Sequence, residues 1–217
     1  MTQLDVRMFT VGPVQENCFI LREKDSPTGL IVDPGDEADK LLEAIERLGI
    51  ETVEAILITH THFDHIGAVA PVAEATKAPV YCPELETQVL ANVMDYVPWP
   101  GFGPFESYAA DHTVAGGETL HLAGLDIDVI FTPGHSPGHV TYAIADQDAL
   151  FSGDVLFQGS VGRVDLPGGD WPTLVASIES LMSAYPAETT VYPGHMGITT
   201  LGRERATNPF LRELAER

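Results

Sequence analysis

Four side chains that commonly bind metal ions lie within six consecutive positions of this sequence. His60, His62, Asp64 and His65 directly follow Thr59 and the apolar run 55–58. Residues two apart in an extended segment face the same side, so the first two histidines are predicted to reach one ion. If the chain then turns into a helix, the aspartate and the last histidine point elsewhere. The segment therefore predicts ligands for two metal ions.

Three further candidate ligands follow short apolar runs at distant points of the chain. They are His135, Asp154 and His195, and a glycine directly precedes each of them. Glycine permits the tight turns that hold a side chain in one orientation. Functional groups in sheets covered by helices gather outside the ends of strands. We therefore expect all seven residues to meet in one pocket.

Imidazole and carboxylate groups in this number predict hydrolytic chemistry with two divalent cations. Water bound to such cations has a pKa lowered toward about 7, so a hydroxide that bridges them would be present at neutral pH. It would attack a carbonyl carbon, and the cations would stabilise the oxyanion that forms. Zinc is the metal that we expect, although iron and manganese suit the same ligands.

The apolar runs predict short strands that alternate with helices, which is typical of the α/β class. One domain over residues 1–217 is the simplest organisation for a chain of this length. The predicted strands are 18–21, 30–32, 55–58, 80–82, 125–131, 141–144, 149–151 and 190–192.

Three helices are predicted from apolar positions that recur at helical spacing. The first spans 38–48, with Asp36 available as its cap, and the second spans 171–185, preceded by Asp170. The third begins near residue 64 and ends before Pro79.

Composition excludes several classes of partner. Thirty-two acidic and eleven basic residues give a formal net charge of −21, which repels a nucleic-acid backbone. No apolar run is long enough to span a membrane, and the first ten residues lack the features of a secretory signal. Cys18 and Cys82 do not form a disulfide framework, which suits a reducing compartment. We therefore expect a cytoplasmic protein.

The motif His-x-His-x-Asp-His, followed by distant His, Asp and His, resembles the metallo-β-lactamase superfamily over nearly the whole chain. The resemblance implies a four-layer αβ/βα sandwich. It also implies that Asp154 bridges the two metal ions and that Asp64 orients the hydroxide as a catalytic residue. The implied ligands are His60, His62 and His135 for one ion, and Asp64, His65 and His195 for the other.

Three further stretches are similar to the glyoxalase II branch, the hydroxyacylglutathione hydrolases. They are the segments 132–139, 153–157 and 207–212. The resemblance implies hydrolysis of a hydroxyacyl thioester, a small-molecule substrate, to a hydroxy acid and a thiol. Only the 22 residues 196–217 follow His195, so the chain is similar to a short form without the helical domain that binds glutathione. The thiol carrier therefore stays open.

Other functions remain compatible with the same residues. A persulfide dioxygenase would use a single iron held by His60, His135 and Asp154. A lactone, a β-lactam or another carbonyl compound could be the substrate, because the same hydroxide attacks any accessible carbonyl. A metal-binding scaffold without catalysis is the remaining alternative.

Residues outside the motif carry weaker predictions. Arg163 and Arg203 are candidates for binding a substrate carboxylate, with Arg212 as a further one, but a pair between Arg163 and Asp165 is an equally open interpretation. The aromatic loop 83–118 either walls the substrate pocket or covers the core or a homodimer contact. His139 is expected to orient a neighbouring ligand, whereas His112 and His121 are expected to have no part in the site.

Overall fold

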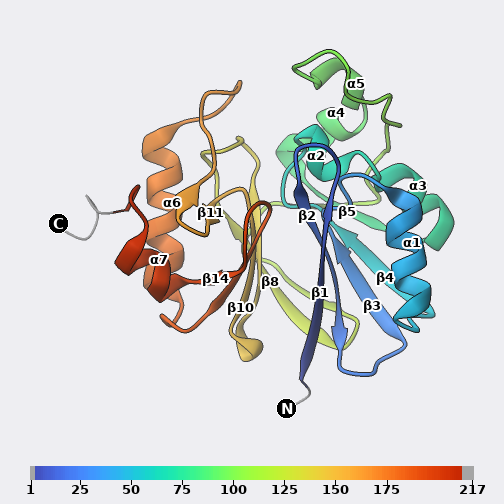
Figure 1. Ribbon diagram of the computed structural model, residues 1–217, viewed down its shortest axis with the longest axis horizontal. Coiled ribbons are helices and arrows are strands. Elements are labelled where there is room, and N and C mark those ends of the chain that lie inside the picture. The colour runs from blue at the N-terminus through green and yellow to red at the C-terminus, as the bar shows by residue number, and fades with distance from the viewer. Residues whose placement is uncertain (1–2, 212–217) are drawn as a thin grey trace.

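The computed structural model describes residues 3–211, which form two six-stranded sheets packed face to face between outer helices (Figure 1). The first sheet has the order β1-β2-β3-β4-β5-β6 and the second the order β14-β13-β10-β9-β8-β7. The first sheet contains β1 (Leu4–Val11), β2 (Glu16–Glu23), β3 (Thr28–Val32), β4 (Thr52–Leu57), β5 (Val80–Pro83) and β6 (His112–Val114). The second contains β7 (Thr119–Leu122), β8 (Leu125–Phe131), β9 (Val140–Ile144), β10 (Ala149–Gly153), β13 (Thr190–Pro193) and β14 (Thr199–Thr200).

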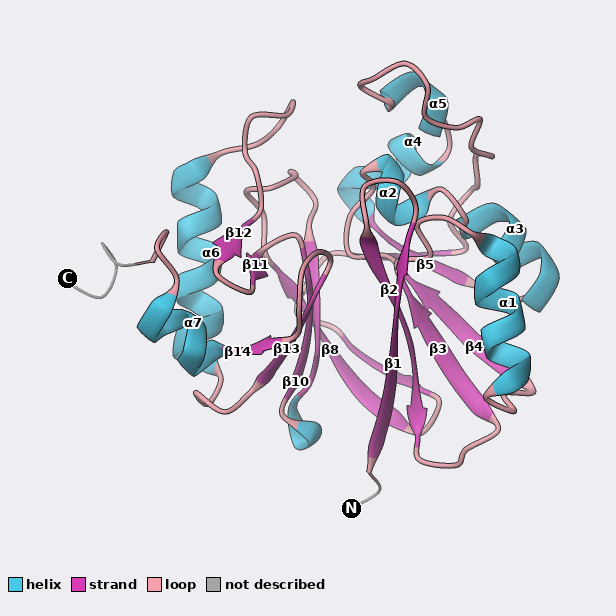
Figure 2. Ribbon diagram, in the orientation of Figure 1, coloured by secondary structure: helices cyan, strands magenta, loops and turns pink. Residues whose placement is uncertain are grey.

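Helices cover the outer face of each sheet, so the chain has four layers (Figure 2). The first sheet is covered by α1 (Ala38–Arg47) and α3 (Val69–Thr76), and the second by α6 (Trp171–Ala184) and α7 (Leu201–Thr207). Shorter elements are α2 (Phe63–Ile66), η1 (Glu84–Glu86), α4 (Thr87–Leu90), α5 (Val93–Tyr96), η2 (Ala145–Gln147) and the small pair β11 (Leu156–Phe157) and β12 (Ser160–Val161). The predicted four-layer α/β sandwich is confirmed.

Strand β2 shows why the apolar runs are continuous rather than alternating. Cys18 and Ile20 pack against the helix layer, whereas Phe19 and Leu21 pack against the second sheet. Successive side chains of a strand point to opposite faces, and here both faces are buried. The third core lies between the second sheet and α6, where Leu174 and Ile178 are fully buried.

The helix expected from residue 64 to residue 79 is two helices, so that prediction was wrong in its continuity. Ala68 between α2 and α3 is not helical, and its N–H donates to Pro34 O at 3.0 Å. Pro71 explains the break, because proline has no N–H to donate to the preceding turn and is tolerated only in the first turn of a helix. The break places Pro71 in the first turn of α3.

The other helices match their predicted ranges within a residue, but only one of the two predicted caps forms. Asp170 accepts from Thr173 N–H at 2.9 Å and caps α6. At α1 the capping position is held by Glu37 without a side-chain hydrogen bond, which corrects the expected cap at Asp36. Edge strand β1 was not predicted, because exposed and half-buried residues such as Arg7 interrupt its apolar pattern. Within residues 3–211, no helix combines the length and apolar character needed to cross a bilayer.

Candidate metal centre

The seven predicted ligands come together at one end of the two sheets. The first four lie in the loop after β4 and in α2, and the other three follow β8, β10 and β13. Among these seven residues, two groups have ligand atoms within 4.8 Å of one another. They are His60, His62 and His135, and Asp64, His65 and His195. Each of these two groups combines residues from both sheets, whereas a third group, Asp33, His60 and His65, lies within the first half of the chain.

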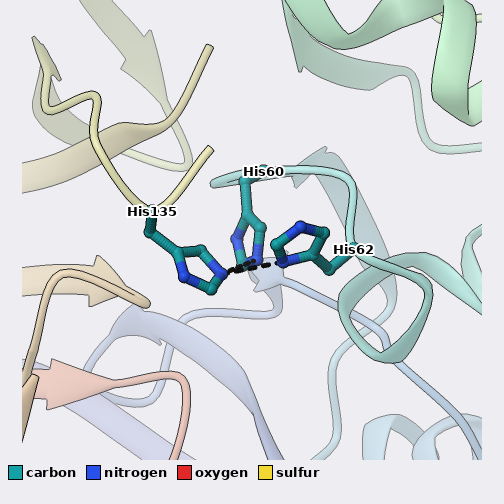
Figure 3. A group of neighbouring side chains, drawn as sticks. All are labelled: His60, His62 and His135. Atoms are coloured by element: carbon teal, nitrogen blue, oxygen red, sulfur yellow. Dashed lines mark hydrogen bonds between the residues drawn. The ribbon is translucent and has the colours of Figure 1, made fainter. Parts of the chain in front are cut away.

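The first group brings three imidazole nitrogens to one point (Figure 3). His135 Nε2 lies 2.8 Å from His62 Nδ1 and 3.1 Å from His60 Nε2. The His135 ring is fixed from behind, because its Nδ1–H donates to Arg163 O at 2.7 Å. Its Nε2 is therefore unprotonated in the neutral ring and presents a lone pair to the other two histidines.

A buried carboxylate fixes the protons of two more ligands. Asp33 accepts from Thr59 Oγ1 at 2.6 Å and from His65 Nδ1 at 3.0 Å. Since the Thr59 hydroxyl donates to Asp33, its oxygen accepts from His60 Nδ1–H at 3.1 Å. In the neutral rings, the Nε2 atoms of His60 and His65 therefore carry lone pairs directed at the site. This is the arrangement that neutral histidine ligands of a metal require.

Asp154 lies between the two groups. Its Oδ2 is 3.4 Å from His135 Nε2 and 3.6 Å from His195 Nε2, and its Oδ1 is 3.3 Å from His65 Nε2. Asp64 Oδ2 is 3.2 Å from His195 Nε2. Oδ2 is thus near both groups and Oδ1 near the second, so the carboxylate has the position of a bridging ligand.

The electrostatics of the site also fit bound cations. Burial lowers the pKa of His60 and, together with the neighbouring His135, lowers that of His62 to about 4, so both rings stay neutral near pH 7. Burial opposes the ionisation of Asp154, but nearby histidines outweigh it and hold the Asp154 pKa well below its usual range. His65 Nε2 and Asp154 Oδ1 are buried without a hydrogen-bond partner. Converging lone pairs and an unpartnered carboxylate oxygen are stabilised by divalent cations.

Comparison with known proteins agrees with this geometry. Residues 11–195 match the profile of the metallo-β-lactamase superfamily. This chain belongs to that superfamily.

Relatives within the superfamily align over nearly their full lengths. The probable metallo-hydrolase YqgX of Bacillus subtilis is 41% identical over 210 residues, which cover 94% of this chain and 96% of the relative. The hydroxyacylglutathione hydrolase GloC of Haemophilus influenzae is 31% identical over 210 residues, which cover 96% of this chain and 98% of the relative.

Solved structures of this superfamily superpose closely on the chain. The structure of the BLEG-1 B3 metallo-β-lactamase has a TM-score of 0.90 at 39% identity and covers 96% of this chain and 100% of its own. TTHA1623 in a di-iron-bound form has a TM-score of 0.83 at 42% identity and covers 94% of this chain and 100% of its own.

Two buried residues support the superfamily's ligand set from behind. His139 Nε2 accepts from Asp154 N–H at 3.0 Å, and its Nδ1–H donates to Thr132 Oγ1 at 3.0 Å. Both ring nitrogens are therefore occupied, in agreement with the expected orienting role. The sequence reasoning missed Asp33, although its position directly after β3 is the same signal that identified the ligands after β4, β8 and β10.

A cavity of about 770 Å³ opens above the ligands, and its walls are largely apolar. The aromatic loop 83–118 contributes both to the cavity wall and to the core. Trp99 lines the cavity, whereas Phe102 and Phe105 pack on Phe63 and extend the core. The apolar lining includes Leu85, Val89, Val93, Tyr96, Val97, Pro98, Pro137, Phe157, Leu166, Pro167 and Met196.

The two arginines proposed for substrate binding occupy different places. Arg163 lines the cavity, lies 5.5 Å from the Trp99 ring centroid and pairs with Asp165 through two contacts of 2.6 and 2.7 Å. The predicted pair with Asp165 therefore forms. Arg203 is exposed on α7, away from the residues that line the cavity. Arg212 lies outside the described residues. His112 and His121 are exposed on β6 and β7 and take no part in the two groups.

Proposed function

We propose that this protein is a metal-dependent hydrolase of hydroxyacyl thioesters, of glyoxalase II type, with two divalent cations. The observation that carries the proposal is the convergence of the two ligand groups on Asp154 beneath an open cavity. The similarity to the hydroxyacylglutathione hydrolase of Haemophilus influenzae supports this substrate class. Zinc is the expected metal, and the di-iron form of TTHA1623 makes iron the main alternative.

The residues around the cations divide the chemical tasks. Bound divalent ions would supply hydroxide at neutral pH and polarise the substrate carbonyl. Asp64 lines the cavity, and its carboxylate would accept a hydrogen bond from the attacking water and so orient it. His60, His62 and His135 act as neutral ligands whose outer nitrogens are already bonded or directed away from the cations. A thiolate leaving group needs little protonation, so no general acid is required.

The cavity walls favour an acyl group or a carrier with apolar surface. Trp99 and Tyr96 form one side, and Phe157 and Met196 lie among the residues that complete the lining. Apolar walls exclude water from the carbonyl and bury the substrate. Arg163 is the basic side chain among these lining residues, and its guanidinium forms an ion pair with Asp165.

A thioester panel tests the proposal. The protein is loaded separately with Zn²⁺, Fe²⁺ or Mn²⁺, its metal content is measured, and release of free thiol is followed for S-lactoyl thioesters of several thiol carriers. Asp154→Asn should lose at least about 100-fold in activity because the bridging charge is removed. His121→Ala, an exposed histidine on β7, is the matched control and should be unaffected. Failure of every metal-loaded form to release thiol from any thioester contradicts the proposal.

β-Lactam hydrolysis is the second candidate, favoured by the close superposition on the BLEG-1 enzyme. A chromogenic cephalosporin belongs in the same panel, and a higher kcat/KM for it than for every thioester would replace the thioester assignment. One iron per chain with oxygen uptake would instead support the persulfide dioxygenase alternative.

Asp165→Asn tests whether Arg163 can bind substrate carboxylates. The pair holds the pKa of Asp165 at about 2, so both groups are charged at neutral pH. Removing the carboxylate frees the guanidinium, and kcat/KM should rise several-fold for thioesters whose carrier bears a carboxylate and stay unchanged for neutral carriers. Glu188→Gln removes an exposed charge elsewhere and serves as the control. Equal changes in kcat/KM for charged and neutral carriers would show that Arg163 does not bind the carboxylate of the carrier.

A further inference from the structure

Glu86 is a buried carboxylate beside the metal ligands, although it is not one of them. Its side chain is 4% exposed, and it lies at the end of η1 in the wall of the cavity. Its Oε2 accepts from Thr61 N–H at 2.6 Å and from Thr61 Oγ1–H at 2.8 Å. Its Oε1 accepts from the Ser136 hydroxyl and from Gly138 N–H at 2.9 Å.

The two oxygens therefore serve two different ligand loops. Thr61 stands between His60 and His62, and Ser136 directly follows His135. These three histidines form the first ligand group, to which the first sheet contributes two and the second sheet one. One carboxylate thus joins the two sides of that group by backbone and side-chain hydrogen bonds. Few other side chains could do so, because the role requires two acceptor atoms a fixed distance apart.

The local structure is built around this contact. A Cβ at position 138 would lie 2.5 Å from Glu86 Cγ, so only glycine lets the loop approach the carboxylate this closely. Four donors stabilise the buried negative charge, which would otherwise be strongly unfavourable. The same carboxylate also anchors η1, so Leu85 and Val89 of the cavity wall are connected to the ligand loops.

We infer that Glu86 is a positioning residue that sets the distance between His135 and the pair His60 and His62, and thereby the affinity of the first group for its cation. The inference rests on the proposed metal binding at this site. Metal affinity is therefore measured directly, apart from thioester hydrolysis, so that either proposal can fail without the other.

The test compares metal binding by four variants of the full chain. Metal-free protein is titrated with Zn²⁺ against a competing chelator, and the visible absorption of bound Co²⁺ reports the geometry at the histidine group. Glu86→Ala should weaken binding of one of the two ions by about 10- to 100-fold and change the Co²⁺ spectrum, because both loops lose their shared acceptor. Glu86→Gln keeps one acceptor oxygen, so its affinity should lie between wild type and Glu86→Ala.

Two controls separate positioning from general stability. Glu84→Gln removes an exposed charge from the same η1 turn and should bind both ions as wild type does. Ser136→Ala deletes only one donor to the carboxylate, and it should weaken one ion several-fold. If Glu86→Ala does not fold, Ser136→Ala still tests the inference.

Two results would overturn the inference. One is wild-type Zn²⁺ affinity and an unchanged Co²⁺ spectrum in folded Glu86→Ala, or in Ser136→Ala where that variant replaces it. The other is a loss of affinity in Glu84→Gln equal to that in Glu86→Ala, because that result would point to overall charge and not to the contacts of Glu86.

Discussion

Several of the predicted metal ligands are held in one tautomer or orientation by a second residue. Thr59 and Asp33 leave His60 Nε2 free, and the Arg163 carbonyl does the same for His135. The Gln15 carbonyl accepts from His195 Nδ1–H at 3.2 Å. An imidazole held in one tautomer is a better ligand because it need not be reordered when the cation binds.

Glycine at position 194 is required by the space around Asp154. A Cβ there would lie 2.3 Å from Asp154 Oδ1 and 2.6 Å from His65 Cε1. Gly194→Ala should therefore displace both ligands and leave the protein with at most one tightly bound ion, as elemental analysis would measure. Gly49→Ala is the control, because its Cβ would contact nothing within 4 Å despite a positive φ of 69°. A variant at position 194 that retains two ions would contradict this steric reason.

The two cysteines should be chemically inert in the folded protein. Both thiols are fully buried, and burial raises the pKa of Cys82 and of Cys18 well above the usual range of a thiol. We expect no alkylation by iodoacetamide at pH 8 before unfolding and two labelled thiols after it. Rapid labelling of the folded chain would contradict this.

The same thiols predict a pH dependence of stability. Each thiol has a higher pKa in the folded protein than in the unfolded chain. Its contribution to stability is fully present below the pKa of the unfolded chain and is lost as the pH rises toward the pKa of the folded protein. The free energy of unfolding should fall by about 1.4 kcal/mol per pH unit for each thiol above about pH 9. Denaturant titrations of wild type and of Cys82→Ala between pH 8 and 10 measure the difference, which should be a shallower slope in the variant.

At the scale of elements, α6 and the β1–β2 turn hold the loops that carry ligands. Ser177 of α6 donates to Pro133 O at 2.7 Å, two residues before His135. Asn17 at the start of β2 donates to Pro193 O at 3.0 Å and to Met196 O at 2.9 Å, on either side of His195. Helix α6 and the start of β2 thus fix the two loops from outside.

Ser177→Ala should separate the effect of the hydrogen bond from Ser177 to the Pro133 carbonyl from the packing of α6. Loss of the hydroxyl leaves the Pro133 carbonyl without this partner, so the free energy of unfolding should fall by about 1–2 kcal/mol. Ser180→Ala lies on the exposed face of the same helix and should change it by less than about 0.5 kcal/mol. Chemical denaturation measures both, and equal values for the two variants would rule out a specific role of this hydrogen bond.

At the scale of the whole molecule, the metal centre connects the two sheets. The first half of the chain supplies four ligands and the second half three, so bound cations join elements that are otherwise held by the core between the sheets. A net charge of −21 makes the folded chain repel itself, and cations at the centre offset part of that repulsion.

Metal removal should therefore lower stability and not activity alone. Ions that bind only the folded state at about 1,000 times their Kd contribute about 4 kcal/mol. Dialysis against EDTA should lower the melting temperature, and returning Zn²⁺ should restore it. Gly194→Ala, which is expected to bind fewer ions, should respond less. A melting temperature that is the same with and without metal would contradict a stabilising role for the centre.

The sequence alone was sufficient to identify the seven candidate ligands, which the structure brings together, and the buried strands. The seven candidate ligands stand out because all are histidine or aspartate near the end of an apolar run, and five of them are next to glycine or to one another, a local pattern that needs no knowledge of the fold. The buried strands can be recognised as continuous apolar runs in the sequence, because both faces of β2 and β4 are apolar. The resemblance to the superfamily rests on these features, and the four-layer sandwich followed from it.

Only the tertiary structure decided what the remaining charged and polar residues do. Glu86 and Glu84 are two positions apart on one turn, yet one is buried among four donors and the other is exposed. The role of Asp33 depends likewise on Thr59 and His65, which are brought from elsewhere in the chain. A carboxylate acquires its function from the donors around it, and those donors become neighbours only when the two sheets pack together.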